Sequence, residues 1–350
     1  MTTFRAPYHQ SDGVTLYAVD AAAGIAALPD RSVDCLVTSP PYWRLRDYAP
    51  DTWTGGRPGC RHRPAEADTP TEGVSGRRDC RDCGALREHP QLGLEPTAEE
   101  YLDAVRAVLT AARRVLSPRA TVWINLGDSY STNSDGYWCT APGQAGQPRY
   151  RPVADVPHKN LLGMPWRLAF ALQSDGWILR SAIVWHKPHA TPTPIRDRLA
   201  ARHEMIFLFV TQPDYYFDLD VIRQPYTGDR ALSRRAHRGG TKPNTARGTW
   251  PRTPAHGQRG RNPGNVWTIP PDRSRAGHPA PSPLEIPRRC IAAGCLPGGH
   301  VLDPFSGSGT TGVAARELGR RFTGIDTNRH YHDIAIRRIT GTAPETGVPR

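Results

Sequence analysis

The sequence predicts one large α/β core with binding loops at the ends of its strands. Apolar strand segments alternate with helical segments along most of the 350 residues, which is the pattern of an α/β fold. A glycine-rich turn joins a strand at 301–303 to a helix. The run Ser39-Pro40-Pro41-Tyr42 ends another strand abruptly, because proline has no N–H for a strand ladder. The proline turn is a stiff loop, and the glycine turn lets a ligand approach the backbone closely.

Residues 15–210 contain both predicted strands and predicted helices. Strands are expected at 15–20 and 33–39, with a helix at 21–30 between them. Thr97, with Glu100 three residues later, is a good helix start, and Ser117-Pro118 is expected to end that helix. Further on we expect a strand at 120–127, a helix at 161–176, and strands at 177–187 and 203–210.

The composition favours a polyanionic partner and argues against a membrane. The chain has 45 Lys and Arg against 33 Asp and Glu, a formal charge of +12. No run of about 18 apolar residues occurs, and the first residues lack the apolar core of a signal peptide. Without such a signal, the seven cysteines are expected to be free thiols or metal ligands rather than disulfides.

Basic residues concentrate in the segment 223–275, where glycine, proline, threonine and asparagine fill the gaps. Such a segment cannot bury a core of its own. It is either a solvated basic loop or a segment that neutralises DNA phosphates and becomes ordered on binding. The candidate phosphate-contacting residues are Arg230, Arg234, Arg235, Arg238, Lys242 and Arg247.

The turn "DPFSGSGTTG" at 303–312 predicts a nucleoside site. Glycines at 307 and 309 let a ligand approach the backbone, and Asp326 at the end of the next strand can bind ribose hydroxyls. The spacing also satisfies a dinucleotide pattern. However, Asp303 would place a carboxylate where a pyrophosphate must lie. A ligand with an ammonium group and no phosphate, such as S-adenosylmethionine, suits this loop better.

Together, "TSPPYW" at 38–43 and "DPFSGSGTTG" resemble the catalytic and cofactor motifs of DNA amino-methyltransferases. With the catalytic motif first, the basic segment in the middle and the cofactor motif last, the order resembles the beta class of that family. The resemblance extends over nearly all of 15–340. It implies a Rossmann-like class I methyltransferase fold with a mixed central sheet and permuted motif order. The cofactor residues it implies are Asp20, Asp303, Pro304, Phe305, Gly307, Gly309, Thr310 and Asp326.

Two of these residues also have simpler explanations. Asp20 matches the family's acid near the cofactor adenine, but it is equally suited to cap the helix that follows it. Thr310, like Thr311 beside it, could donate a hydrogen bond to the methionine carboxylate or merely start its helix.

The resemblance also identifies Ser39, Pro40, Pro41 and Tyr42 as the catalytic residues and assigns roles to three of them. The Ser39 side chain and the Pro40 carbonyl would each accept one N–H from an exocyclic amine, and Tyr42 would stack on a base turned out of the duplex. The faces of Tyr42 and Trp43 are both expected to be available to a flat ligand. Serine at position 39 favours cytosine N4, whereas adenine N6 enzymes more often carry Asp or Asn there. Carbon-5 methylation would need a Pro-Cys pair, which the sequence lacks.

Cysteine spacing in the inserted region 44–96 predicts a structural zinc site. Cys60, His62, Cys80 and Cys83 form C-x-H followed by C-x-x-C-G, and three thiolates with one imidazole suit tetrahedral zinc. Such a site would fold a loop that has no core. His89 is an alternative fourth ligand, and reduced cysteines in a flexible loop are the simpler interpretation.

The sequence as a whole predicts a site-specific DNA methyltransferase. Its partner would be double-stranded DNA, and a cognate restriction endonuclease would fit a bacterial or phage-encoded cytoplasmic enzyme. An N6-adenine enzyme is the first alternative, and an RNA or protein methyltransferase the second. The expected parts are a catalytic half at 1–43 and 97–222, the cysteine insertion at 44–96, the basic recognition segment at 223–275, a cofactor half at 276–340 and a tail at 341–350.

Overall fold

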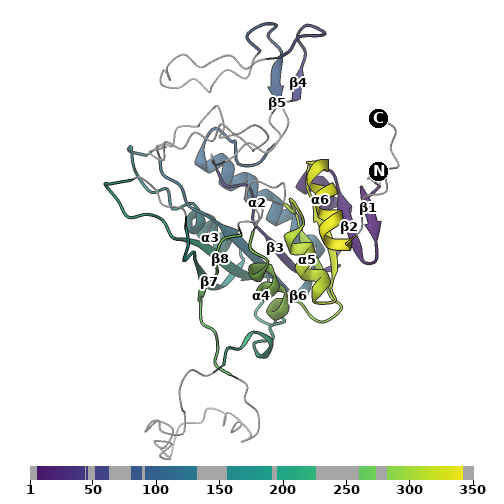
Figure 1. The fold of residues 1–350 in the computed structure, drawn as a ribbon, viewed down its shortest axis with the longest axis vertical. Helices are drawn as coiled ribbons and strands as arrows, with labels where there is room; N and C mark the ends of the chain where they lie inside the picture. Colours follow the sequence, from purple (N-terminus) through teal and green to yellow (C-terminus); the bar gives the residue numbers. More distant parts are fainter. Residues whose placement is uncertain are drawn as a thin grey trace, which may run out of the picture.

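A nine-stranded mixed sheet forms the centre of the computed structural model (Figure 1). The structure describes residues 6–43, 45, 52–62, 80–88, 91–131, 156–190, 195–225, 260–272 and 282–341. The strands of the sheet are β1 (His9–Ser11), β2 (Val14–Tyr17), β3 (Val33–Thr38), β6 (Leu116–Leu126), β7 (Ile178–His186), β8 (His203–Val210), β9 (Val266–Thr268), β10 (His300–Asp303) and β11 (Arg321–Ile325). They are arranged in the order β1-β2-β11-β10-β3-β6-β8-β7-β9.

Five neighbouring strands of this sheet run parallel. β2, β11, β10, β3 and β6 pair in parallel, while β8 is antiparallel to both β6 and β7. The carboxyl ends of the five parallel strands therefore meet at one edge. β10, near the end of the chain, lies directly beside β3. This confirms that two sequence-distant halves build one sheet.

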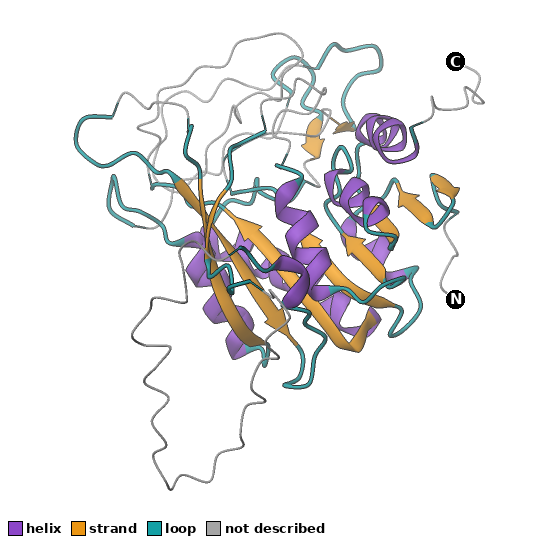
Figure 2. Cartoon of the chain, turned by 60° about the horizontal axis from the view of Figure 1, so that its bottom comes forward, coloured by secondary structure: helices purple, strands orange, loops and turns teal. Residues whose placement is uncertain are grey.

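Helices cover both faces of the sheet (Figure 2). α1 (Ala21–Ala26), α2 (Ala98–Val115) and α3 (Met164–Ser174) pack on one face. α4 (Glu285–Gly294), α5 (Thr310–Glu317) and α6 (Arg329–Thr340) pack on the other. Along β3, Leu36 packs into the core on the side of α1, α2 and α3, and its neighbours Cys35 and Val37 pack into the core on the side of α4, α5 and α6. This alternation is the two-residue period of a strand that is buried on both faces.

The start of α2 was predicted correctly, and its connection to β6 was not. Thr97 accepts a hydrogen bond from the Glu100 backbone N–H at 3.1 Å, as a capping residue does. However, β6 begins directly at Leu116, so Pro118 lies inside a strand. Pairing with β3 is irregular between Val33 and Cys35, and this bulge accommodates a proline that cannot donate to the ladder.

Three elements of the main α/β unit were not expected from the sequence. The short strand β1 pairs with β2 as a hairpin, and α6 follows the last strand. The third is β9, which lies within the basic segment and pairs with β7 at the sheet edge, where Trp267 is buried. This part of the segment therefore belongs to the sheet.

Three shorter elements lie outside the main sheet, and the sequence did not predict them either. In the cysteine insertion, β4 (Thr52–Thr54) and β5 (Leu86–Glu88) form a separate two-stranded antiparallel sheet (Figure 1). A 3-10 helix, η1 (Asp220–Ile222), packs against α4. In the part of the chain that the structure describes, no helix is both long and apolar enough to span a bilayer.

Candidate cofactor and catalytic site

Asp303 lies at the carboxyl end of β10 and connects the two motif loops. The Thr38 hydroxyl, at the end of β3, donates to its Oδ1 at 2.7 Å, and the Thr311 hydroxyl, in α5, donates to its Oδ2 at 2.6 Å. The side chain is almost fully buried. Burial raises the pKa of this carboxyl to about 6, even though the hydrogen bonds from Thr311 and Thr38 favour its charged form.

The glycine loop turns tightly between β10 and α5 and packs against α6. Gly309 has φ +78°, and a Cβ there would lie 2.7 Å from the Ala335 Cβ. Gly312 is also constrained, because its Cβ would lie 2.4 Å from a methyl carbon of Ile339. The glycine pattern is therefore explained partly by close helix packing, in addition to any approach of a ligand.

Asp326 and Arg338 hold the same loop from two sides. The Gly307 backbone N–H donates to Asp326 Oδ2 at 2.9 Å, and burial raises the pKa of this carboxyl. Arg338 in α6 donates to the Ser308 carbonyl at 2.8 Å and to the Thr310 hydroxyl at 3.1 Å. Thr310 therefore starts its helix and also accepts from a half-buried guanidinium.

The other expected cofactor residues lie at the same edge of the sheet. Asp20 follows β2 and caps α1, with its Oδ1 accepting from the Ala23 backbone N–H at 2.8 Å. The capping interpretation is therefore confirmed, and contact with an adenine stays a prediction. Pro304 is buried in the turn and Phe305 is partly exposed.

The proline loop follows β3 and is held by its neighbours. The Tyr101 hydroxyl of α2 donates to the Pro41 carbonyl at 3.0 Å. Pro40 is buried, whereas Ser39 and Tyr42 are half-buried. The expectation for Trp43 was wrong, because its ring is 2% exposed in the core and its indole N–H donates to the Glu95 carbonyl at 3.0 Å. Tyr42 is therefore the aromatic residue of this loop that a ligand can reach.

Beneath Tyr42 lies a polar cluster that the sequence analysis missed. The Tyr42 hydroxyl donates to Glu204 Oε2 at 2.6 Å, and the Asn125 amide donates to both groups, at 2.6 and 2.7 Å. Lys187 pairs with the other oxygen of Glu204. The available signal was an acid in the apolar strand "HEMIFLFV" and an amide at the end of "ATVWINLG".

Strand pairing places the two motif loops side by side. Val301 and Leu302 of β10 pair with Cys35 and Leu36 of β3, so the loops leave adjacent strands about 5 Å apart. A molecule held by the glycine loop would lie beside the Ser39 hydroxyl. Ligands of open α/β sheets bind outside the carboxyl ends of such strands. The arrangement can therefore position two reactants for transfer of a group between them.

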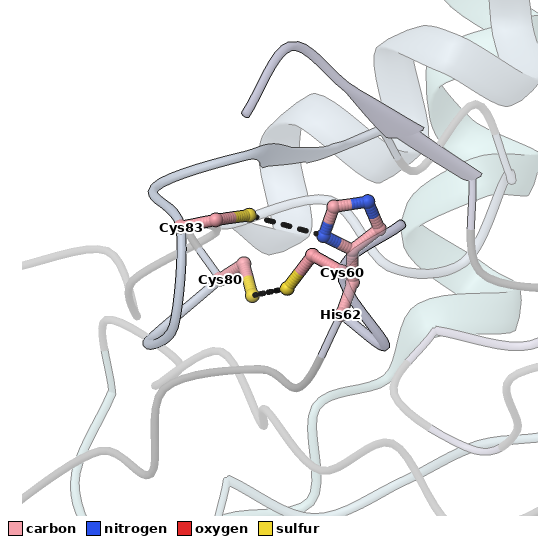
Figure 3. A group of neighbouring side chains, drawn as sticks. All are labelled: Cys60, His62, Cys80 and Cys83. Atoms are coloured by element: carbon pink, nitrogen blue, oxygen red, sulfur yellow. Dashed lines mark hydrogen bonds between the residues drawn. The ribbon is translucent and has the colours of Figure 1, made fainter. Parts of the chain in front are cut away.

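The four expected metal ligands come together next to the two-stranded sheet of β4 and β5 (Figure 3). Their candidate ligand atoms all lie within 4.8 Å of one another. Cys60 Sγ lies 3.9 Å from Cys80 Sγ, and Cys83 Sγ lies 3.2 Å from His62 Nδ1. Zinc–sulfur bonds of about 2.3 Å in a tetrahedron separate two sulfurs by about 3.8 Å. The donor set and its spacing therefore fit zinc.

The candidate DNA-contacting residues lie outside the described part of the chain. These residues are Arg230, Arg234, Arg235, Arg238, Lys242 and Arg247. His89, the alternative metal ligand, also lies outside the described part.

Comparison with known proteins gives a consistent result. The family model described as DNA methylase matches residues 33–337. The type II methyltransferase M.Cfr9I of Citrobacter freundii is 35% identical over 94% of this chain and 89% of its own. M.SmaI of Serratia marcescens is 33% identical over 91% of this chain and 88% of its own.

Solved structures share the fold at low sequence identity. PvuII DNA methyltransferase, described as cytosine-N4-specific, superposes with a TM-score of 0.56 at 15% identity over 96% of both chains. A DNA modification methylase of Thermus thermophilus, complexed with S-adenosyl-L-methionine, gives 0.52 at 20% identity over 96% of this chain and 99% of that one.

Proposed function

This chain belongs to the DNA methylase family, and we propose that it transfers a methyl group from S-adenosylmethionine to the N4 amine of cytosine in duplex DNA. The observation that carries the proposal is the contact between Thr38 and Asp303, which ties the Ser39 loop to the glycine loop. Its relatives are type II methyltransferases, which favours a restriction-modification setting for this chain.

Two carboxylates favour S-adenosylmethionine as the ligand: Asp303 at the start of the glycine loop and Asp326 beside that loop. The residues that would hold it are Asp303 and Phe305 near the methionine end and Asp326 near the ribose, with Asp20 a further candidate at the adenine. Burial makes ionisation of Asp303 costly, and a cationic ligand nearby would offset that cost. The bound cofactor supplies an electrophilic methyl group on a sulfonium.

Ser39 and Pro40 would prepare the target amine. An exocyclic amine is a weak nucleophile because its lone pair is delocalised into the ring. When the Ser39 hydroxyl and the Pro40 carbonyl each accept one N–H, the nitrogen is drawn towards tetrahedral geometry and its lone pair can point at the methyl group. Positioning of the two reactants supplies most of the rate. Tyr42 would stack on the base after it has left the duplex.

Serine at position 39 favours cytosine over adenine, and the structural match to a cytosine-N4-specific enzyme supports the same choice. N6-adenine methylation remains the second candidate, because the family model covers both amines. Within the segment 223–275, the residues proposed to contact DNA phosphates are Arg230, Arg234, Arg235, Arg238, Lys242 and Arg247. The proposed setting is a cytoplasmic enzyme whose companion would be a restriction endonuclease of the same specificity.

The decisive experiment is to identify the methylated nucleoside. The protein is incubated with unmethylated genomic DNA and S-adenosylmethionine, and the DNA is digested and analysed by mass spectrometry. We expect N4-methylcytosine. N6-methyladenine would retain the mechanism and reject the base. If the cofactor binds and no modified nucleoside forms on diverse DNA, the DNA substrate is wrong.

We also propose that Cys60, His62, Cys80 and Cys83 hold a structural zinc ion. The ion would fix the two-stranded sheet of β4 and β5, which lies apart from the main core. Metal analysis of purified protein should give one zinc per chain, and Cys83→Ser should lose it. Cys290→Ser, which changes a buried thiol elsewhere, is the control. One zinc retained by the Cys83 variant would contradict the proposal.

A further inference from the structure

The clearest unassigned feature is the polar cluster beneath the proline loop. We propose that Glu204 is a positioning residue that sets the direction of the Ser39 hydroxyl: acting through Tyr42, it makes Ser39 donate inward, so that the serine oxygen accepts from the target amine. The proposal rests on the proposed function of Ser39 and explains how a hydroxyl, which could donate or accept, is restricted to accepting.

Glu204 is the fixed end of the chain of hydrogen bonds. Its carboxylate is 15% exposed and pairs with Lys187, which is 20% exposed and also lies over the Trp185 ring. Its Oε1 pairs with the Lys187 ammonium, so Glu204 is the carboxylate of an ion pair in this structure. An ionised carboxylate can only accept hydrogen bonds.

The direction of the next two bonds follows from this. At 2.6 Å from Glu204 Oε2, the Tyr42 hydroxyl must use its single proton to donate to the carboxylate. The Ser39 Oγ lies 3.3 Å from the same tyrosine oxygen. Since Tyr42 has no second proton, this bond exists only if Ser39 donates. The serine proton is then directed inward, and the lone pairs of Oγ are presented to the site.

Asn125 reinforces the same polarity. Its Nδ2 donates to the Tyr42 oxygen at 2.6 Å and to Glu204 Oε2 at 2.7 Å. The opposite amide orientation would place a carbonyl oxygen against the carboxylate, so the donors fix how the side chain is oriented. Its Oδ1 is buried and has no hydrogen-bond partner among the described residues. A buried acceptor without a partner is unfavourable, and here it accompanies the two hydrogen bonds that Nδ2 donates to the cluster.

Asn125, Glu204 and Lys187 lie on or directly after three different strands. Asn125 lies near the end of β6, Glu204 near the start of β8, and Lys187 directly after β7. β8 runs antiparallel to β6 and β7, which brings the start of one strand to the ends of two others. The cluster is therefore built on rigid elements, so its geometry is set before a substrate arrives.

A double-mutant cycle tests this role. Single-turnover methylation of unmethylated genomic DNA, at saturating S-adenosylmethionine, is measured for Tyr42→Phe, Glu204→Gln, Ser39→Ala and the pairs with Ser39→Ala. Tyr42→Phe retains the ring and removes only the hydroxyl. Each of the first two should lower the rate about 10- to 100-fold, the usual value of a charge-assisted bond. Affinity for S-adenosylmethionine should be unchanged.

The cycle separates polarity from simple structural support. In the Ser39→Ala background, Tyr42→Phe should cost less than about 3-fold, since there is no hydroxyl left to direct. The carboxylate of Ser39→Asp can only accept hydrogen bonds, so in this variant too the rate should be insensitive to Tyr42→Phe. This variant replaces Ser39→Ala in the cycle if Ser39→Ala is too slow to measure. The control Tyr215→Phe removes a phenol that accepts from Arg180 after the far end of β8 and should leave the rate unchanged.

The outcomes distinguish the two proposals. Full activity of Ser39→Ala would reject the proposed role of Ser39 itself. A second outcome is that Ser39→Ala is impaired, but Tyr42→Phe lowers the rate in the Ser39→Ala and Ser39→Asp variants as much as it does in the wild type. This outcome would overturn only the role of Glu204 and Tyr42. Glu204→Gln leaves Lys187 without its partner and could unfold the protein, so Tyr42→Phe decides the matter.

Discussion

Replacing Asp303 with asparagine should stabilise the ligand-free protein and weaken its binding of S-adenosylmethionine. The carboxyl is 4% exposed and must lose its hydration to ionise. Asparagine has the same shape and cannot ionise. The Thr311 hydroxyl, which now donates to Oδ2, can turn and accept from the new amide.

The magnitude follows from the pKa shift. Burial raises the pKa of Asp303 from 3.8 to about 6. Because the folded-state pKa is the higher one, the folded protein binds more protons between these values and becomes less stable as the pH rises through them. A shift of roughly two units corresponds to about 3 kcal/mol at pH 7, at 1.36 kcal/mol per unit. The asparagine variant avoids this cost, so we expect a gain of about 2 to 3 kcal/mol in the free energy of unfolding.

Urea unfolding at two pH values provides the assay. The gain from Asp303→Asn should be largest at pH 7 and shrink to about 1 kcal/mol at pH 4.5, where the wild-type carboxyl is mostly protonated in the folded state. Calorimetric titration should show at least a tenfold loss of affinity for S-adenosylmethionine. A variant less stable than wild type at pH 7, or a gain equal at both pH values, would refute the reasoning.

Two further predictions concern the target side of the site. Gly127→Ala would place a Cβ 2.7 Å from Tyr42 Cε2, so the tyrosine ring must move. We expect kcat to fall about 10- to 100-fold while the affinity for S-adenosylmethionine is unchanged. An unchanged kcat would mean that the position of the ring is not critical. Changing Arg234, Arg235 and Arg238 to Glu should weaken DNA binding and flatten its salt dependence by roughly 2 to 3 in log–log slope, and filter binding with the same salt series would show no change if these residues do not contact phosphates.

Local sequence patterns predicted those elements that depend on local physics. The strand expected at 203–210 is β8, His203–Val210, because its apolar run is continuous and bounded by polar residues. The proline loop and the glycine turn lie at strand ends as expected, since proline and glycine constrain the backbone wherever they occur. The Cys and His spacing also brought its four side chains together, because a C-x-x-C turn is a local structure.

Contacts between distant strands could not be predicted in the same way. Glu204 lies 162 residues from Tyr42, and its role depends on β8 pairing with β6, a register that no local pattern specifies. The burial of Trp43 likewise depends on a contact with Glu95, which lies beyond most of the inserted region. β9 was missed because three residues in a glycine- and proline-rich segment carry too little periodicity to be distinguished from a loop.

The order of the two halves along the chain has little effect on the site. Parallel strands joined by helices bring their carboxyl ends to one edge whichever half comes first, so β10 can lie beside β3 although about 260 residues separate them. What the site requires is a bond between the two loops that strand pairing alone does not provide. Asp303 supplies it, since one carboxylate accepts from Thr38 at the catalytic strand and from Thr311 at the cofactor helix. The position of the Ser39 loop therefore depends on the same buried side chain that is proposed to face the cofactor.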